Sequence, residues 1–138
     1  SQNNNRKVIV RANEADTTEF KSLRGIGSVL ASRIVKFRDA LGGFHDVKQL
    51  QEVYGLSEET YQSIDKQLDL ANQPIKKLKI NTLGANDLAK HPYINKKQAQ
   101  LIMNFRNEHG PYTDMRNLLQ NKGLDPEFLR KIEPYLEF

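Results

Sequence analysis

An internal repeat constrains this chain more than any other feature. When the sequence is shifted by 68 residues, residues 8–70 align without gaps with residues 76–138, and 14 of the 63 aligned positions are identical. The identities fall at expected core and turn positions, among them Asn13/Asn81, Ile26/Ile94, Ala31/Ala99, Ile34/Ile102, Gly42/Gly110 and Gly55/Gly123. Such self-similarity at a fixed period is typical of a duplicated structural unit. We therefore predict two tandem copies of one small fold.

The boundaries of the copies follow from the repeat and from local composition. Residues 8–70 form the first predicted unit and residues 78–138 the second, which we expect to be degenerate. Residues 71–77 are predicted to form a linker, and the polar residues 1–7 a flexible start. Val8–Val10 is expected to be an extended lead-in rather than a strand of a sheet.

Helical signals account for most of the first unit, and no strand-like alternation recurs along the chain. Asp16 is a suitable N-cap for a helix over Thr17–Leu23, and a second helix is predicted over Ser28–Ala40. A short helix over Val47–Val53 and a last one capped by Ser57 complete the unit. The predicted fold class is therefore all-α.

The turn Gly25-Ile26-Gly27 joins the first two predicted helices. Glycine accepts a positive φ and puts no side chain between the backbone and a ligand. The amides that open the next helix lack intrahelical partners and lie at the positive end of the helix dipole. The turn is therefore suited to an anion, above all a phosphate. The alternative is a tight turn that only connects two helices.

The residues around this turn resemble the helix-hairpin-helix motif, which binds the DNA backbone without reading sequence. They are apolar Phe20 and Leu23, the turn Gly25–Gly27, then Ala31, Ile34 and Val35. Over nearly the whole chain the sequence also resembles the competence DNA-receptor (ComEA-type) family. The matching stretches are Leu23–Arg38 and Gly42–Phe44 in the first unit, and Asn81-Thr82, Ile102–Arg106 and Gly110–Tyr112 in the second.

These resemblances imply several properties. The units would be SAM-like small helical bundles of paired hairpins that bind duplex DNA. The protein would take part in DNA uptake and would be exported or membrane-tethered, in the periplasm or at the cell surface. Some relatives hold a monovalent cation with the carbonyls of the turn, here Gly25–Gly27, and no other cofactor is expected.

The second unit departs from the motif at its first turn. His91-Pro92-Tyr93-Ile94-Asn95 replaces the glycine turn, so that Tyr93 and Asn95 bring side chains to the place where phosphate would approach. Asn95 can still cap the helix that follows. His91 occupies the position of Leu23 and is expected to be packed. Lys96 and Lys97 come next and could contact phosphate by charge alone, the alternative being a solvated helix face.

Charge is unevenly distributed. Residues 1–73 hold 10 basic and 10 acidic residues, whereas residues 74–138 hold 11 and 7, which gives the net charge of +4. Basic residues nevertheless surround the glycine turn, namely Lys21, Arg24, Arg33, Lys36 and Arg38. The predicted DNA contacts are the amides of Gly25, Ile26, Gly27 and Ser28 and the side chains of Lys21, Arg24, Arg33, Lys96 and Lys97.

No catalytic residue and no metal site are predicted. The chain has no cysteine, which excludes thiolate metal sites and cysteine nucleophiles, and no His/Asp/Glu spacing matches a metal site. One enzyme alternative is a base-excision DNA glycosylase, because Asp46 lies 19 residues after Gly27, near the place of the catalytic Asp in that class. Asp114 repeats Asp46 in the second unit, and an N-cap role fits both.

The main alternative function is a protein-interaction or structural helical module without DNA binding. The lost glycines of the second unit and the neutral first half favour it. A monomer is expected. No apolar run approaches the about 20 residues of a membrane span, so no membrane insertion is expected for this stretch.

Overall fold

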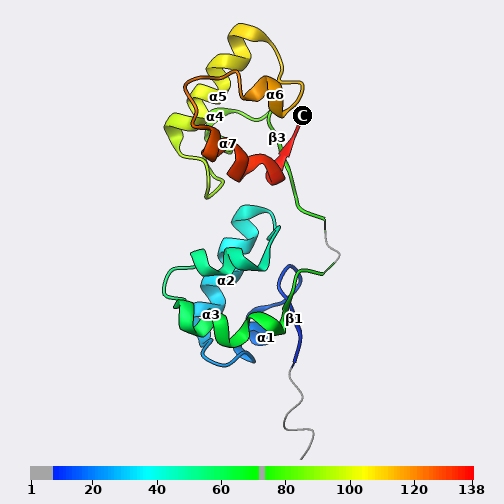
Figure 1. The fold of residues 1–138 in the computed structure, drawn as a ribbon, viewed down its shortest axis with the longest axis vertical. Helices are drawn as coiled ribbons and strands as arrows, with labels where there is room; N and C mark the ends of the chain where they lie inside the picture. The colour runs from blue at the N-terminus through cyan, green and yellow to red at the C-terminus, as the bar shows by residue number, and fades with distance from the viewer. Residues whose placement is uncertain (1–7, 72–73) are drawn as a thin grey trace, which may run out of the picture. The chain divides into compact units, whose positions relative to one another are not determined.

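The computed structural model describes residues 8–71 and 74–138 and is mostly helical, which confirms the predicted fold class (Figure 1). The described residues divide into two compact units. The first contains the residues up to Asp39 together with those of Gly43–Ile75, and the second contains Ala40–Gly42 and Lys76–Phe138. The predicted flexible start, residues 1–7, and residues 72–73 of the predicted linker lie outside the described residues.

The first hairpin of the first unit is formed by α1 and α2. In chain order the elements of this part are β1 (Val10–Arg11), α1 (Thr17–Lys21), α2 (Ser28–Leu41), η2 (Val47–Glu52), α3 (Glu58–Ile64), η3 (Asp65–Gln67) and β2 (Leu68–Asp69). Asp16 caps α1 as predicted, because its Oδ1 accepts from the amide of Glu19 at 2.8 Å. The helix ends two residues earlier than predicted, and the third helix, η2, is a 3₁₀ helix.

The second unit repeats this order, with a first helix that is one residue shorter and with an α-helix, α6, in place of the 3₁₀ helix η2. Its elements are β3 (Leu78–Lys79), α4 (Ala85–Leu88), α5 (Lys96–His109), α6 (Met115–Leu118), α7 (Pro126–Ile132), η4 (Glu133–Tyr135) and β4 (Leu136–Glu137). Gly84 stands at the N-cap of α4, where the first unit has Asp16, and it makes no side-chain cap. α4 nevertheless begins at the repeat position where α1 begins, and it ends one residue earlier than α1 does.

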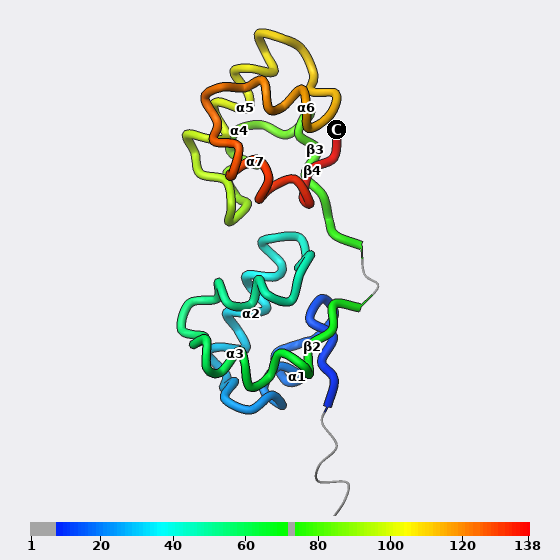
Figure 2. Tube along the Cα trace, viewed as in Figure 1, coloured from blue at the N-terminus to red at the C-terminus, as the bar shows by residue number. Residues whose placement is uncertain are grey.

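A parallel bridge of two residues per strand closes each unit by joining its start to its end. β1 pairs with β2, with Val10 opposite Leu68, and β3 pairs with β4 (Figure 2). Beyond the first bridge, the amide of Ala12 donates to the carbonyl of Asp69 at 2.6 Å. The expectation that Val8–Val10 contains no strand residue is therefore wrong for Val10. A two-residue strand is too short to show an alternating pattern in the sequence.

Most of the buried side chains of the two units occupy the same repeat positions. Ile34 on α2 and Ile102 on α5 are fully buried, as are Phe44 and Tyr112. In the second unit, one apolar cluster is formed by Ile80, Leu88, Ile94, Ala99, Ile102, Tyr112, Leu118, Leu124, Leu129, Ile132 and Leu136. Because a one-residue slip would turn these side chains out of the core, the matching burial explains why the 68-residue repeat is free of gaps.

One asparagine in each unit fixes the segment before the first helix. The Asn13 side chain donates to the carbonyl of Phe44 at 2.9 Å and accepts from the amide of the same residue at 2.7 Å. Asn81 makes the same pair of bonds with Tyr112, at 2.8 and 2.7 Å. The identity of Asn13 and Asn81 in the repeat is thus explained by two long-range hydrogen bonds in each unit.

An arginine on the long helix of each unit supports the same segment. Nη1 of Arg38 donates to the carbonyls of Ala12 and Ala15. Nη1 of Arg106 donates to the carbonyls of Ile80 and Leu83, both at 2.9 Å. Arg38 was expected among the charges around the glycine turn, and this expectation is wrong, because its side chain is only 13% exposed and bonds inside the fold.

Candidate nucleic-acid interface

Each unit contains two hairpins, and the same type of backbone hydrogen bond occurs in all four turns. In every turn the amide of a buried apolar residue donates to the carbonyl three residues earlier. These bonds are Ile26 to Leu23 at 3.1 Å, Leu56 to Val53 at 3.1 Å, Ile94 to His91 at 3.0 Å and Leu124 to Asn121 at 3.1 Å. The loss of both glycines in the turn of the second unit therefore leaves the shape of that hairpin intact.

The residue after the buried apolar residue distinguishes the first hairpin from the other three. In those three it is a capping residue, and its side chain accepts from an amide in the first turn of the next helix. The caps are Ser57 on Thr60 at 3.1 Å, Asn95 on Gln98 at 2.7 Å and Asp125 on Glu127 at 3.0 Å. In the first hairpin this residue is Gly27, which has no side chain. Within residues 8–71 and 74–138, no side chain accepts from the amides that open α2.

Gly25 and Gly27 have different physical roles. Gly25 has φ +87°, and a Cβ there would lie 2.9 Å from Cγ2 of Thr60, so both the backbone and the packing require glycine. Gly27 lies just before α2, and its carbonyl accepts from the amide of Ala31 at 2.9 Å. A Cβ on Gly27 would meet no atom within 4 Å. The start of α2 is therefore open to an approaching group.

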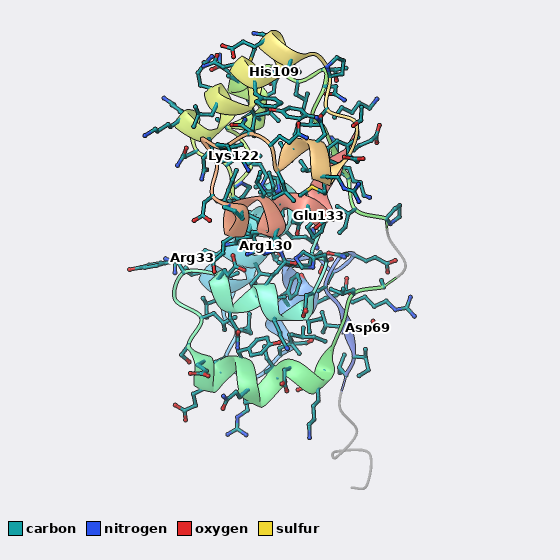
Figure 3. The ribbon with its side chains drawn as sticks, turned by 45° about the horizontal axis from the view of Figure 1, so that its top comes forward. Arg33, Asp69, His109, Lys122, Arg130 and Glu133 are labelled. Carbon is teal, nitrogen blue, oxygen red and sulfur yellow. The ribbon has the colours of Figure 1, made fainter. Side chains whose placement is uncertain are left out.

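The predicted side chains around this turn are only partly free. Lys21 and Arg24 are exposed, and the first turn of α2 holds no acidic residue. Arg33, labelled on the first unit in Figure 3, donates from Nη1 to the carbonyl of Tyr54 at 2.9 Å. The amide of Ile26, predicted as a phosphate donor, already donates to the carbonyl of Leu23. The open amides are those after the buried Ile26 side chain.

The first turn of the second unit carries side chains where the first unit has glycines, in agreement with the sequence. Asn95 and Gln98 form a reciprocal capping box at the start of α5. His91 is buried as expected, and its ring centroid lies 5.4 Å from that of Tyr93 and 4.8 Å from that of Tyr135. Burial lowers the pKa of the His91 imidazole, which keeps the ring neutral.

Lys96 and Lys97 are exposed in the first turn of α5. They lie beside a helix start that Asn95 already caps. This part of the second unit therefore offers positive charge rather than open amides.

Asp46 is an N-cap, as the sequence predicts. It caps η2 by accepting from the amide of Lys48 at 2.9 Å, while its own amide donates to Gln49 Oε1 at 3.1 Å. Asp114 caps α6 in the same way by accepting from the amide of Asn117 at 2.8 Å. Both carboxylates are thus used in helix capping.

In residues 8–71 and 74–138, no group of three or more His, Cys, Asp or Glu side chains is arranged to hold a metal ion. None of the described helices is both long and apolar enough to cross a membrane.

One exposed residue near the candidate interface was not identified from the sequence. Tyr54 lies in the second turn of the first unit, and its side chain is 81% exposed although it is large and aromatic. The guanidinium carbon of Arg33 lies 4.9 Å from the centroid of the Tyr54 ring. An aromatic residue directly before the turn glycine Gly55 was the available sequence signal.

The curated relatives are much longer than this chain. One is "Endonuclease/exonuclease/phosphatase family domain-containing protein 1" of Danio rerio, which is 25% identical over 138 residues. The protein of the same name in Homo sapiens is 26% identical over 149 residues. Each alignment covers 87% of this chain but only 25% and 26% of the respective relative. The chain therefore spans about a quarter of the length of the curated relatives that it matches. No solved structure matches the chain significantly.

A sequence family accounts for both units. The family described as "Helix-hairpin-helix motif" matches residues 5–69 and again residues 73–137. Motifs of this family generally bind DNA without sequence specificity. The two matches together cover nearly the whole chain, and each spans the two hairpins of one unit. The chain therefore belongs to the helix-hairpin-helix motif family.

Proposed function

We propose that the first unit binds DNA through the phosphate backbone, without reading base sequence, and that its first hairpin makes the contact. The observation that carries the proposal is the replacement of a capping side chain by Gly27 in this hairpin alone among the four. Ser57, Asn95 and Asp125 would each compete with a phosphate for the same first-turn amides, and Asp125 would also repel it.

The amides of Gly27, Ser28 and Val29 are the donors to the oxygens of one phosphate group. They lie at the positive end of the 14-residue helix α2, where an anion is stabilised by the helix dipole. Lys21 and Arg24 are exposed close by in the chain and supply positive charge to the neighbouring phosphates. Contacts of this kind position a protein on DNA but carry no sequence information.

The expected affinity follows from the small number of contacts. Nonspecific backbone binding typically has a Kd on the order of 10⁻⁴–10⁻⁶ M at physiological salt, and the logarithm of the binding constant falls linearly with the logarithm of the salt concentration. A single hairpin with a few cations belongs in this range. The salt slope therefore reports how many phosphates the chain contacts.

The second unit has a different proposed role. Its first turn keeps the hairpin hydrogen bond but uses Asn95 as a cap and places Tyr93 where the first unit has Gly25. These features favour a structural or protein-contacting module, with Lys96 and Lys97 adding only nonspecific attraction for DNA. This role is the second candidate function, and it applies to this unit.

The test is fluorescence anisotropy of a labelled duplex of arbitrary sequence at several salt concentrations. Gly27→Glu adds a side chain and a negative charge at the open amides. Gly84→Glu is the matched control, because Gly84 also precedes a helix and a Cβ there also meets no atom within 4 Å. Salt-sensitive binding that Gly27→Glu removes and Gly84→Glu retains supports the proposal. Binding that survives Gly27→Glu, or no binding at low salt, overturns it.

Two finer aspects of the proposal have other support. The resemblance to the competence DNA-receptor family supports DNA uptake by an exported or membrane-tethered protein. We further propose that this stretch binds rather than cleaves DNA, because Asp46 and Asp114 are used as helix caps. Incubation of the chain with duplex and damaged DNA should give no strand scission and no base release. Base release that Asp46→Asn abolishes would instead establish the glycosylase alternative.

A further inference from the structure

The side chain of Tyr54 is unusually placed for an aromatic residue. It projects from the second turn of the first unit with 81% of its surface exposed, more than any other large hydrophobic side chain in the described residues. Burying an aromatic ring is strongly favourable, so an exposed ring at a turn forgoes that stabilisation. Nothing in the core of the unit requires an aromatic residue at this position.

Arg33 holds this ring from one side. Its guanidinium carbon lies 4.9 Å from the ring centroid, and its Nη1 donates to the carbonyl of Tyr54 at 2.9 Å. The hydrogen bond fixes the guanidinium, and the cation–π contact fixes the ring against it. The exposure of the ring leaves its opposite face open to solvent. The exposed face of the Tyr54 ring is thus held in a fixed orientation without any ligand.

The ring stands beside the helix that carries the open amides. A Cβ on Gly55, the next residue, would lie 2.6 Å from Nη1 of Arg33 and 3.4 Å from Cδ2 of Leu30, so this turn packs against α2. Ser28 and Arg33 are separated along α2 by a rise of about 7.5 Å. At about 3.4 Å per nucleotide of a DNA strand, this is a step of about two nucleotides.

Val29 extends the same surface toward the open amides. It is 63% exposed, and it lies four residues before Arg33, which places the two side chains on the same face of α2. Amide donors, an apolar side chain and a backed aromatic ring therefore follow one another on the first unit. This order matches the phosphate, sugar and base of a nucleic acid strand.

We propose that Tyr54, backed by Arg33, stacks on an unpaired base of a DNA strand, about two nucleotides from the phosphate that is held at the start of α2. The base must be unpaired, because in a continuous duplex each base is covered by its neighbours and a ring on a protein turn reaches only sugar and phosphate. The first unit then prefers DNA with a gap, an end or a loop over an intact duplex. This inference rests on the proposed function of the first hairpin.

The second unit supplies an internal contrast. At the positions of Tyr54 and Arg33 it has Lys122, labelled in Figure 3, and Leu101. It therefore has neither the ring nor the guanidinium at this place. Substitution of Lys122 provides a matched control on an exposed turn residue.

The experiment compares two labelled circular DNAs of the same length and sequence. One is a covalently closed duplex without unpaired bases, and the other is the same duplex with a three-nucleotide gap in one strand. The full chain should bind the gapped DNA about five- to tenfold more tightly, as expected for one stacked base. Tyr54→Leu should remove this preference and leave the affinity for the intact duplex unchanged. Lys122→Leu should keep the preference. Circular dichroism checks that each variant folds.

A spectroscopic measurement reports stacking directly. The chain has no tryptophan, so Tyr54→Trp introduces a single one at the proposed platform. Its fluorescence should be quenched by the gapped DNA and much less by the intact duplex. Equal affinity of the chain for the two DNAs, a preference that survives Tyr54→Leu, or unquenched Trp fluorescence with gapped DNA bound would overturn the inference.

The controls separate this inference from the proposed function. Gly27→Glu should weaken binding to both DNAs, whereas Tyr54→Leu affects only the gapped one. Duplex binding that is lost in Gly27→Glu without any preference for the gap would refute the platform and retain the phosphate site. Full binding of both DNAs by Gly27→Glu would refute the phosphate site itself.

Discussion

The side-chain amide nitrogen of Asn121 donates a hydrogen bond to the hydroxyl oxygen of Tyr112 across 3.3 Å. The same hydroxyl donates to the carbonyl of Ile102 at 2.7 Å. At the equivalent positions the first unit has Phe44 and Val53, which carry no polar side-chain atom. The two units thus fill the same two core positions differently. The first unit uses two apolar side chains, and the second uses a polar pair joined by a hydrogen bond.

Substitution of this pair should give strongly non-additive losses. Asn121→Val also removes a bond to the carbonyl of Leu101 at 3.1 Å, and it should lower the free energy of unfolding by about 2 kcal/mol. Tyr112→Phe should cost about 1 kcal/mol. The double variant, which copies the first unit, should lose less than the sum of the two. Urea denaturation followed by circular dichroism measures the three values, and strict additivity would show that the two side chains are not coupled.

The stability of the second unit should fall at high pH because of Tyr112. Burial raises the pKa of its phenol above the ordinary value of about 10, outweighing the opposing effects of the Asn121 hydrogen bond and the Arg106 charge. The folded state therefore holds the proton more tightly than the unfolded state. The stabilisation is fully present below pH about 10 and is lost as the pH rises through the higher pKa of the folded state. Thermal unfolding between pH 8 and 11.5 should show a decline that Tyr112→Phe reduces.

The two glycines of the first turn should respond differently to alanine. Gly25→Ala forces a side chain into a positive φ and against Thr60, and should cost about 1–2 kcal/mol or more of unfolding free energy. Gly27→Ala meets open space and should change the unfolding free energy by less than about 0.5 kcal/mol. Denaturant unfolding of both variants provides the comparison. Equal losses would contradict the separate roles assigned to the two positions.

A capping side chain placed at the open start of α2 should raise the stability of the fold and weaken DNA binding. Gly27→Asp supplies the side-chain acceptor that the other three hairpins have, and a negative charge near the helix dipole. It should raise the unfolding free energy by about 0.5 kcal/mol and weaken duplex binding at least several-fold. Parallel measurement of unfolding and anisotropy on one preparation gives both effects. A variant that gains stability and binds DNA as before would show that the amides of α2 are not the phosphate site.

Local signals in the sequence were sufficient to predict much of the fold. The capping side chains of Asp16, Ser57 and Asn95 act on amides two or three residues away, so their spacing alone marks the helix starts. The repeat located the core positions because buried side chains at equal spacing must face the same way. The open position Gly27 was also visible, since the other three hairpins carry a polar residue there.

Contacts between distant residues were not predictable in this way. Arg33 reaches the turn at Tyr54, 21 residues away, and Arg38 reaches Ala12, 26 residues away. In the sequence all these arginines are equivalent positive charges near the glycine turn. Only the packing of one hairpin on the other determines which charge lies beside a carbonyl or an aromatic ring and which remains free for a ligand.

The short bridges at the ends of each unit have a mechanical consequence. β1 and β2 run parallel, and so do β3 and β4, although the members of each pair begin and end the same unit. Tension applied to the two ends of a unit therefore pulls its two strands past each other along their length. The hydrogen bonds of the bridge are then loaded together in shear instead of opening one after another. A unit that is pulled at its two ends would therefore keep both hairpins folded until the hydrogen bonds of this bridge break.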